Sequence, residues 1–314
     1  MQLSSLFMVG LPANNDLMFV EELRPSGVIL MGRNARPFEQ IQELTRQLRE
    51  LGVSLIASDH EGGRVQRLKE GFTVLPLARE VASGGIENVR ATAHLVGREL
   101  GNAGINFNFA PVCDVPIHEG DTVIGHRAFS TNFKEAGELA SVYCQGLQER
   151  VGACAKHFPG HGGVGVDSHF GLPVFPGTVE ELEPHLVPFK STIKSGVSAI
   201  MVAHISVPSL DPTNSPASLS QSIATDLLRG ELGYEGLVVS DDLEMGALGN
   251  IGAGDIAVRA LNAGCDLLLF CHSASKVIEA KAAVEAALSD GRLERVRVEE
   301  ALARIETWKG KFAS

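Results

Sequence analysis

The chain lacks several features that would assign it to a broad class of protein. None of its 314 residues belongs to an apolar run of the ~18 residues that a membrane-spanning helix requires. Its first residues lack the basic and long apolar segments of a secretory signal peptide. Basic residues are scarce, since 27 Lys and Arg stand against 38 Asp and Glu, for a net charge of −11. This balance argues against a nucleic-acid partner and a polybasic membrane anchor, and no feature indicates an obligatory protein partner.

The cysteine pattern is equally informative by what is missing. The chain contains no C-x-x-C pair, and its five cysteines are an odd and scattered set: Cys113, Cys144, Cys154, Cys265 and Cys271. This usage is typical of reduced thiols in a cytoplasm and argues against a structural zinc site. Hydrophobic residues make up 44% of the chain and charged residues 21%, which is ordinary for a globular protein. We therefore expect a cytoplasmic globular protein with no bound metal.

Short apolar runs recur along the whole chain. Their continuous hydrophobicity, over six or seven residues each, is typical of strands that are buried on both faces of a parallel sheet. There are eight such runs: Leu6–Leu11, Gly27–Gly32, Val53–Ser58, Ile105–Ala110, Gly152–His157, Ser198–His204, Gly236–Asp241 and Asp266–Cys271.

Helical patterns separate these runs. In Phe38–Leu51, for example, Ile41, Leu44 and Leu48 fall on one face, and Gly52 ends the pattern. Several helices are expected to end at a glycine just before the next strand: Gly104, Gly152, Gly196, Gly233 and Gly264. The other predicted helices are Asn88–Leu100, Lys134–Val151, Val179–Lys194, Ser222–Leu232, Asp255–Asn262, Ser275–Leu288 and Glu294–Trp308. Alternating strands and helices predict an α/β protein, a single-domain (β/α)8 TIM barrel over residues 1–314.

The ends of the predicted strands are unusually polar. Active groups of such barrels stand at the carboxyl ends of the strands, and helix capping alone would not explain so many polar ends. We therefore expect an active site here. The polar ends comprise Arg33-Asn34, Asp59-His60-Glu61, Asp114, Arg127 in the following loop, Lys156-His157, His204, Asp241-Asp242 and Cys271-His272.

Two of these places suggest catalytic chemistry. Asp241 directly follows a strand and should face the barrel mouth as a nucleophile or base, whereas Asp242 should make supporting hydrogen bonds. The glycine-rich loop 156–173 contains Asp167 and His169, which are close enough for the carboxylate to orient the imidazole and raise its pKa. In the same loop His161 is expected to satisfy backbone groups within the turn. Capping, ion pairing and solvent exposure are the structural alternatives for these side chains.

Other polar residues suggest sugar binding. Lys156 ends a buried strand, so it requires either a carboxylate neighbour or a ligand. Asp59 with Arg64 or Arg67 could grasp sugar hydroxyls, and a simple loop salt bridge explains them equally well. The Gly62-Gly63 pair would let the backbone turn sharply between them.

Three segments of the sequence carry distinctive motifs: DHEGGRVQRL at 59–68, KHFPGHGGVGVDSH at 156–169 and GLVVSDDLEMGAL at 236–248. They resemble glycoside hydrolase family three, and within it the bacterial β-N-acetylglucosaminidases of peptidoglycan recycling. Three shorter segments, FAPVCDV at 109–115, IGHRAFS at 124–130 and PASLS at 216–220, are also similar to that family. The resemblance spans nearly the whole chain in the family's order.

The resemblance implies a role for each matching residue. Asp241 corresponds to the nucleophile, and His169, assisted by Asp167, to the general acid/base. Sugar-binding positions fall on Asp59, Arg67, Arg127, Lys156 and His157. It also implies a retaining exo-enzyme that needs no cofactor or metal and releases β-linked GlcNAc from GlcNAc-anhydro-MurNAc muropeptides. Larger relatives carry the acid/base residue on a second domain, for which this chain has no room.

The sequence departs from the family at one place and leaves alternatives open. Many relatives have Asp-Thr where this chain has Gly163-Val164, a change that affects the packing of the loop and spares the D-S-H triplet. A β-glucosidase of the same family is one alternative. A metal-dependent amidohydrolase could use His157, His204 and Asp241 as ligands, although the first strand carries no H-x-H pair. A non-catalytic sugar-binding barrel is the third.

Overall fold

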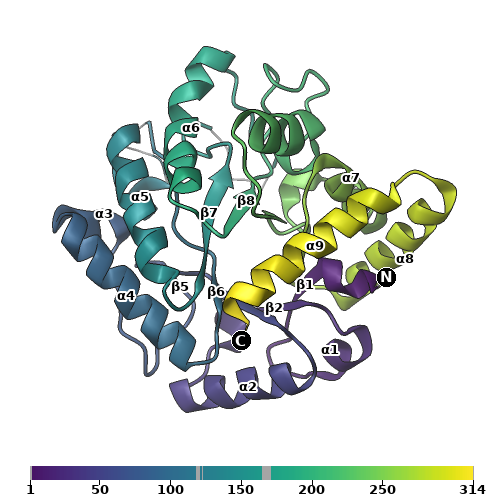
Figure 1. Ribbon diagram of the computed structural model, residues 1–314, viewed down its shortest axis with the longest axis horizontal. Helices are drawn as coiled ribbons and strands as arrows, with labels where there is room; N and C mark the ends of the chain where they lie inside the picture. The colour runs from purple at the N-terminus through teal and green to yellow at the C-terminus, as the bar shows by residue number, and fades with distance from the viewer. Residues whose placement is uncertain (1, 118–120, 122, 165–170, 314) are drawn as a thin grey trace.

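The protein is an eight-stranded parallel barrel surrounded by helices (Figure 1). The computed structural model describes residues 2–117, 121, 123–164 and 171–313. Over these residues the strand order is β10-β1-β2-β3-β6-β7-β8-β9. A parallel bridge between Val239 and Leu267 joins the two ends of this sheet, and the Ser240 N–H donates to the Leu267 carbonyl at 3.0 Å. The predicted α/β barrel is confirmed.

Each of the eight predicted apolar runs coincides with a barrel strand; seven strands are shorter than their runs, and the strand that begins at Gly152 extends one residue beyond its run, to Phe158. The strands are β1 (Phe7–Gly10), β2 (Gly27–Leu30), β3 (Leu55–Ser58), β6 (Phe107–Asn108), β7 (Gly152–Phe158), β8 (Ala199–Val202), β9 (Leu237–Ser240) and β10 (Leu268–Phe270). Their residues are buried throughout except Gly10, which is partly exposed. This burial explains why the strands are continuously hydrophobic rather than alternating.

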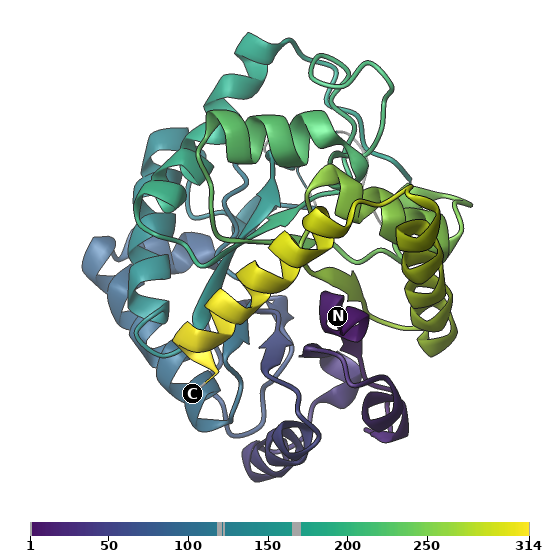
Figure 2. The ribbon, with the colours of Figure 1, turned by 45° about the vertical axis from the view of Figure 1, so that its right-hand side comes forward.

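The helices lie outside the barrel (Figures 1 and 2), and the hydrophobic side chains on one side of each helix are buried. They are α1 (Met18–Leu23), α2 (Phe38–Glu50), α3 (Ala78–Ser83), α4 (Ile86–Asn102), α5 (Phe133–Leu147), α6 (Val179–Lys194), the π-helix η5 (Ser222–Glu231), α7 (Ala253–Ala263), α8 (Ala274–Asp290) and α9 (Arg295–Phe312). As predicted, Ile41, Leu44 and Leu48 form the buried face of α2. The start of α6 is fixed by a capping box between Thr178 and Glu181.

Helix α9 crosses the barrel at the amino ends of its strands (Figure 1). There the Trp308 ring packs on Phe107, with ring centroids 4.5 Å apart. A Cβ atom on Gly152 would lie 2.3 Å from the Trp308 ring. Gly152 therefore begins β7 and makes room for the indole, so the prediction that it ends the preceding helix was wrong. Helix α5 stops earlier, at Leu147.

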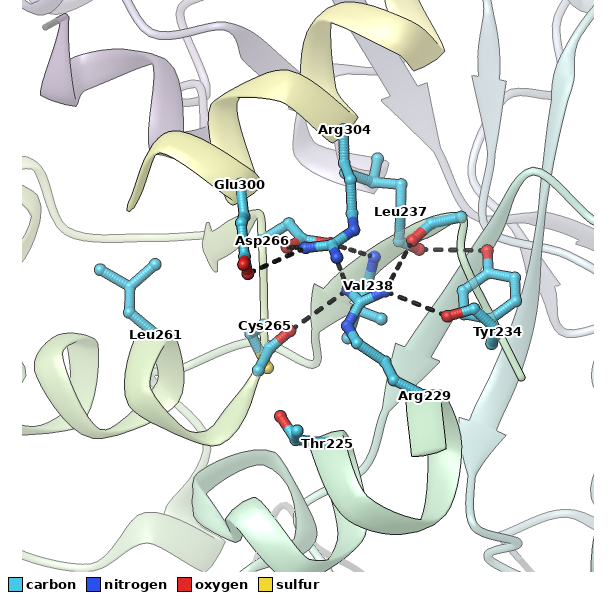
Figure 3. A network of polar contacts seen from close by, with 12 residues as sticks. Thr225, Arg229, Tyr234, Leu237, Val238, Leu261, Cys265, Asp266, Glu300 and Arg304 are labelled. Carbon is cyan, nitrogen blue, oxygen red and sulfur yellow. Dashed lines mark hydrogen bonds and ion pairs between the residues drawn. The ribbon is translucent and has the colours of Figure 1, made fainter. Parts of the chain in front are cut away.

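A buried ionic cluster joins α9 to the same end of the barrel (Figure 3). Asp266 is fully buried and pairs with Arg229 of η5 at 2.5 Å and with Arg297 of α9 at 2.6 Å. Arg304, also of α9, lies 3.3 Å from the same carboxylate. The Val238 N–H of β9 donates to it at 3.0 Å. This end of the barrel is therefore closed by packing and ion pairs, which leaves the opposite end for a ligand.

Several short elements of the described residues had no counterpart in the sequence prediction, and three of them bear on the fold. Two are α1 and α3, each of which has six residues and is too short for a helical repeat to show. The third is an antiparallel hairpin of β4 (His60–Gly62) and β5 (Val65–Gln66) directly after β3. In the part of the chain that the structure describes, no helix is long and apolar enough to cross a membrane.

Candidate active site

A polar pocket of about 540 Å³ lies at the carboxyl ends of the strands, where barrels of this kind place their active groups. Its polar lining contains, among others, Asp59, Glu61, Arg64, Arg67, Arg127, Lys156, His157, His161, Asp241, Asp242, Glu244 and His272. The described sugar-binding candidates and the candidate nucleophile thus lie in one pocket. Asp167 and His169 fall outside the described residues, so their predicted pairing stays a prediction.

The β4–β5 hairpin brings Arg67 back onto Asp59. Its turn contains Gly62 and Gly63, with φ of 110° and 54°, values that favour glycine. A Cβ atom on Gly62 would also lie 2.5 Å from the Pro76 carbonyl oxygen. The Arg67 guanidinium lies 3.3 Å from the Asp59 carboxylate, and both side chains face the pocket. The predicted sharp turn is confirmed, and the two residues form an ion pair in the wall of the pocket.

Lys156 is held by two carboxylates. Its Nζ lies 2.8 Å from Asp59 and 2.6 Å from Glu61, and its side chain is only 3% exposed. Glu61 also receives two hydrogen bonds from Arg127, each of 2.8 Å. Lys156 was predicted to have either a carboxylate neighbour or a ligand, and the structure shows two carboxylate neighbours. Burial by itself would raise the pKa of Glu61, but the charges of Arg127 and Lys156 outweigh it and hold that pKa well below its ordinary value.

Sequence reasoning placed Glu61 at a polar strand end but assigned it no role in the site. A signal was available, because Glu61 stands two residues after Asp59 in an extended segment and side chains at that spacing share a face. His60 faces the other way and is fully buried, with its ring 5.9 Å from that of Phe72. Because side chains alternate along this segment, Asp59 and Glu61 face the pocket and His60 faces the core.

Lys156 and His157 are successive residues, yet both line the pocket. The pairing of β7 with β8 shifts register between Ala155 and Phe158, and such irregularities re-aim side chains beside active sites. Nδ1 of the His157 ring lies 2.6 Å from the Asp114 carboxylate, within hydrogen-bond distance. A strand pattern alone could not show that two neighbouring side chains share one face.

Asp241 follows β9 and faces the pocket, as its position in the sequence predicted. Burial would raise its pKa, but the charge of His157 acts most strongly in the other direction and the pKa lies below its ordinary value. Asp241 is therefore an ionised carboxylate at neutral pH. Asp242 accepts hydrogen bonds from the backbone N–H groups of Cys271 and Glu244, each at 3.2 Å, which fits its predicted supporting role.

Several polar strand ends support the pocket from behind instead of lining it. Arg33 donates to the Leu11 carbonyl at 2.7 Å and also contacts Cys271 and His272, so it ties β1, β2 and β10 together. His204 is fully buried. Its two ring nitrogens lie 2.7 Å from Ser218 and 2.8 Å from the Asp242 carbonyl. His204 thus braces the backbone next to Asp241.

His161 has more contacts than sequence reasoning gave it. Its backbone N–H donates to Asp114 at 2.6 Å, while its ring lines the pocket and lies 5.9 Å from the His157 ring. Over the described residues, His, Cys, Asp and Glu side chains form no group of three or more that could hold a metal ion.

Comparison of the sequence with models of protein families shows which family the chain belongs to. The model of the glycosyl hydrolase family 3 N-terminal domain matches residues 3–308. The chain belongs to glycosyl hydrolase family 3. It is 41% identical over 271 residues to a β-hexosaminidase of Thioalkalivibrio sulfidiphilus, a match that covers 82% of this chain and 77% of that protein. A β-hexosaminidase of Chromobacterium violaceum is 36% identical over 302 residues, which are 92% of this chain and 83% of that one.

Solved structures of family 3 members are similar over the whole barrel. A family 3 β-N-acetylglucosaminidase from Paenibacillus sp. str. FPU-7 superposes with a TM-score of 0.94 at 37% identity, covering 99% of this chain. This chain spans only 62% of the length of that protein. A β-N-acetylhexosaminidase from Beutenbergia cavernae superposes with a TM-score of 0.91 at 29% identity, with 98% of this chain and 97% of that one covered. The chain is thus a glycoside hydrolase.

Proposed function

We propose that the protein is a retaining exo-β-N-acetylglucosaminidase that removes terminal β-linked GlcNAc from GlcNAc-anhydro-MurNAc muropeptides. The names of its relatives support a β-hexosaminidase, and the proposal adds the sugar, the stereochemistry and the source of the substrate. The proposal includes a cytoplasmic location, because the cysteine pattern is typical of reduced thiols and because imported wall fragments would be encountered there.

The observation that carries the proposal is an ionised, partly exposed carboxylate in a pocket whose charged side chains suit sugar hydroxyls. Asp241 lies at the end of β9, and Asp59, Lys156, Arg127, Arg67 and His157 line the same pocket. Asp241 attacks the anomeric carbon, the glycosidic C–O bond breaks, and a glycosyl ester forms on the Asp241 carboxylate. Water then cleaves this ester at the anomeric carbon, so two inversions retain the configuration.

The proton for the leaving oxygen comes from His169 in this proposal. Asp167 orients its ring and favours the imidazolium, and the same ring then removes a proton from the attacking water. The assignment rests on the D-S-H match at 167–169.

The substrate test compares p-nitrophenyl N-acetyl-β-D-glucosaminide with the β-D-glucoside. A site that hydrogen-bonds the acetamido group leaves polar groups unpaired when that group is missing, so kcat/KM should favour the N-acetyl sugar by at least about 10²-fold. Asp241→Asn should lose several orders of magnitude in turnover, since it keeps the shape of the side chain and removes the nucleophile. A 5-fluoro N-acetylglucosaminyl probe should label the peptide that contains Asp241.

Each outcome bears on a separate part of the proposal. A kcat/KM ratio near one would assign the protein to the β-glucosidase alternative. Loss of activity with EDTA would support the amidohydrolase alternative, and no turnover of any glycoside would support a non-catalytic sugar-binding barrel. Covalent label on another peptide would remove Asp241 as the nucleophile.

A further inference from the structure

Asp114 is a fully buried carboxylate just behind the pocket. It is 1% exposed, and its oxygens receive hydrogen bonds from two residues of the β7 end. Oδ1 accepts from the His161 backbone N–H at 2.6 Å. Oδ2 lies 2.6 Å from His157 Nδ1, and the His157 backbone N–H lies 3.2 Å from both oxygens. One carboxylate thus holds both the ring and the backbone of His157.

The charge of Asp114 fixes the proton on the His157 ring. Burial would raise the pKa of Asp114, but its contacts with His157 and His161 outweigh burial and keep that pKa below its ordinary value. An ionised carboxylate can only accept hydrogen bonds. His157 Nδ1 must therefore carry a proton whether or not the ring is charged, and Nε2 is the nitrogen on the opposite edge of a ring that lines the pocket.

Asp114 also fixes the first residues of the loop after β7. Besides the hydrogen bond to His161, the backbone at Gly162 packs so closely on Val115 that a Cβ atom there would lie 1.8 Å from the Val115 carbonyl oxygen. The Cys113 N–H donates to the Lys156 carbonyl at 2.6 Å. The segment 113–115 is therefore the support for both His157 and the start of this loop.

We propose that Asp114 is a positioning residue that keeps His157 in the Nδ1–H tautomer, so that Nε2 of the neutral ring accepts a hydrogen bond from a substrate hydroxyl. This rests on the proposed function, because it takes His157 as a sugar-binding residue. His157 and Asp241 line the same pocket, so the orientation of the His157 ring affects the surroundings of the candidate nucleophile as well.

The test is Asp114→Asn. The amide oxygen can take the place of Oδ1 and keep both backbone hydrogen bonds. The amide nitrogen would then face His157 Nδ1 as a donor, which forces the ring proton onto Nε2. Asp266→Asn is the matched control, since Asp266 is also a fully buried carboxylate but lies at the other end of the barrel.

The primary readout is the tautomer, measured by long-range ¹H–¹⁵N spectra of the imidazole rings. The His157 signals are assigned by their loss in His157→Gln. The wild type should show a protonated Nδ1, and Asp114→Asn should move the proton to Nε2. On p-nitrophenyl N-acetyl-β-D-glucosaminide, kcat/KM should fall by about 10²-fold or more in Asp114→Asn, as wrong-tautomer substitutions do elsewhere. Asp266→Asn should lower Tm and leave kcat/KM and the His157 signals unchanged.

The outcomes separate this inference from the proposed function. A wild-type His157 with its proton on Nε2 would overturn the role of Asp114, even if Asp114→Asn fails to fold. A wild-type Nδ1–H together with normal kcat/KM in Asp114→Asn would overturn it too. If the wild type hydrolyses no glycoside, the proposed function fails, while the spectra still decide how Asp114 holds the ring.

Discussion

Glu61→Gln tests whether the ion pairs around Lys156 stabilise the barrel. The side chain of Glu61 is 4% exposed and lies 2.6 Å from Lys156 and 2.8 Å from Arg127. Glutamine keeps the shape and one acceptor oxygen but removes the charge that both cations face. Removing one partner of a buried ion pair costs about 3–5 kcal/mol. The retained oxygen favours the lower end, about 3 kcal/mol, which is a large part of a typical stability of about 5–15 kcal/mol.

The assay is thermal unfolding followed by circular dichroism. A loss of 1 kcal/mol in stability lowers Tm by about 2–4 °C in domains of about 150–250 residues, so Tm should fall by roughly 6–12 °C here. The pKa of Glu61 is lowered in the folded state from an ordinary value of 4.5. The stability that this carboxylate contributes is therefore present above pH 4.5 and is lost as the pH falls further. The difference in Tm between the wild type and Glu61→Gln should stay constant from pH 8 to 5.

Glu43→Gln is the matched control, because Glu43 pairs with Arg46 at 2.6 Å on the exposed face of α2 with 51% of its side chain exposed. Exposed pairs contribute little, so Tm should not change measurably. Equal effects of the two substitutions, or a difference in Tm that narrows between pH 8 and 5, would refute the reasoning.

Two further predictions concern residues away from the pocket. Burial lowers the pKa of His60 from 6.5 to about 4. As the pH falls, the unfolded chain therefore binds a proton at His60 before the folded chain does. The free energy of unfolding should fall between pH 6.5 and 4, by up to about 3 kcal/mol. His60→Leu should flatten this part of the Tm-against-pH curve, and an unchanged slope would show that His60 is not the cause. Gly152→Ala should lower Tm because its Cβ would lie 2.3 Å from Trp308. Gly101→Ala in α4 should not, since its nearest contacts would be at 3.8 Å, and equal shifts would remove Trp308 as the reason.

The barrel could be predicted because burial on both faces leaves a direct trace in the sequence. Each apolar run coincided with a strand, and Val179–Lys194 matches α6 at both ends. The ends of other elements depend on contacts distant in sequence. Gly152 is one example, because the residue that makes a glycine necessary there is Trp308, on the last helix. The single domain over residues 1–314 stays a prediction.

The candidate site could be predicted only in part, because a polar residue at a strand end has several possible uses. Asp241 and His204 follow neighbouring strands, yet one lines the pocket and the other supports the backbone beside it. Asp114 is similar to Asp59 in sequence context, but its oxygens are already taken by His157 and His161. The role of each polar side chain depends on the position of the groups that it contacts. Those groups lie at the ends of other strands, so the local sequence does not show them.

Charge pairing in the pocket supports the proposal that it binds a sugar. Five carboxylates and four cations are part of its described lining: Asp59, Glu61, Asp241, Asp242 and Glu244 against Arg64, Arg67, Arg127 and Lys156. Their formal charges nearly cancel, so a fully anionic ligand would find no net attraction among them. Sugar hydroxyls both donate and accept, and charged groups make stronger hydrogen bonds than neutral ones. Hydroxyls can therefore bind to carboxylates and cations that are already paired without leaving a buried charge alone. The charges at the other end of the barrel are not balanced in this way. There the single carboxylate of Asp266 faces three arginines, and this cluster joins the last helix to the strands.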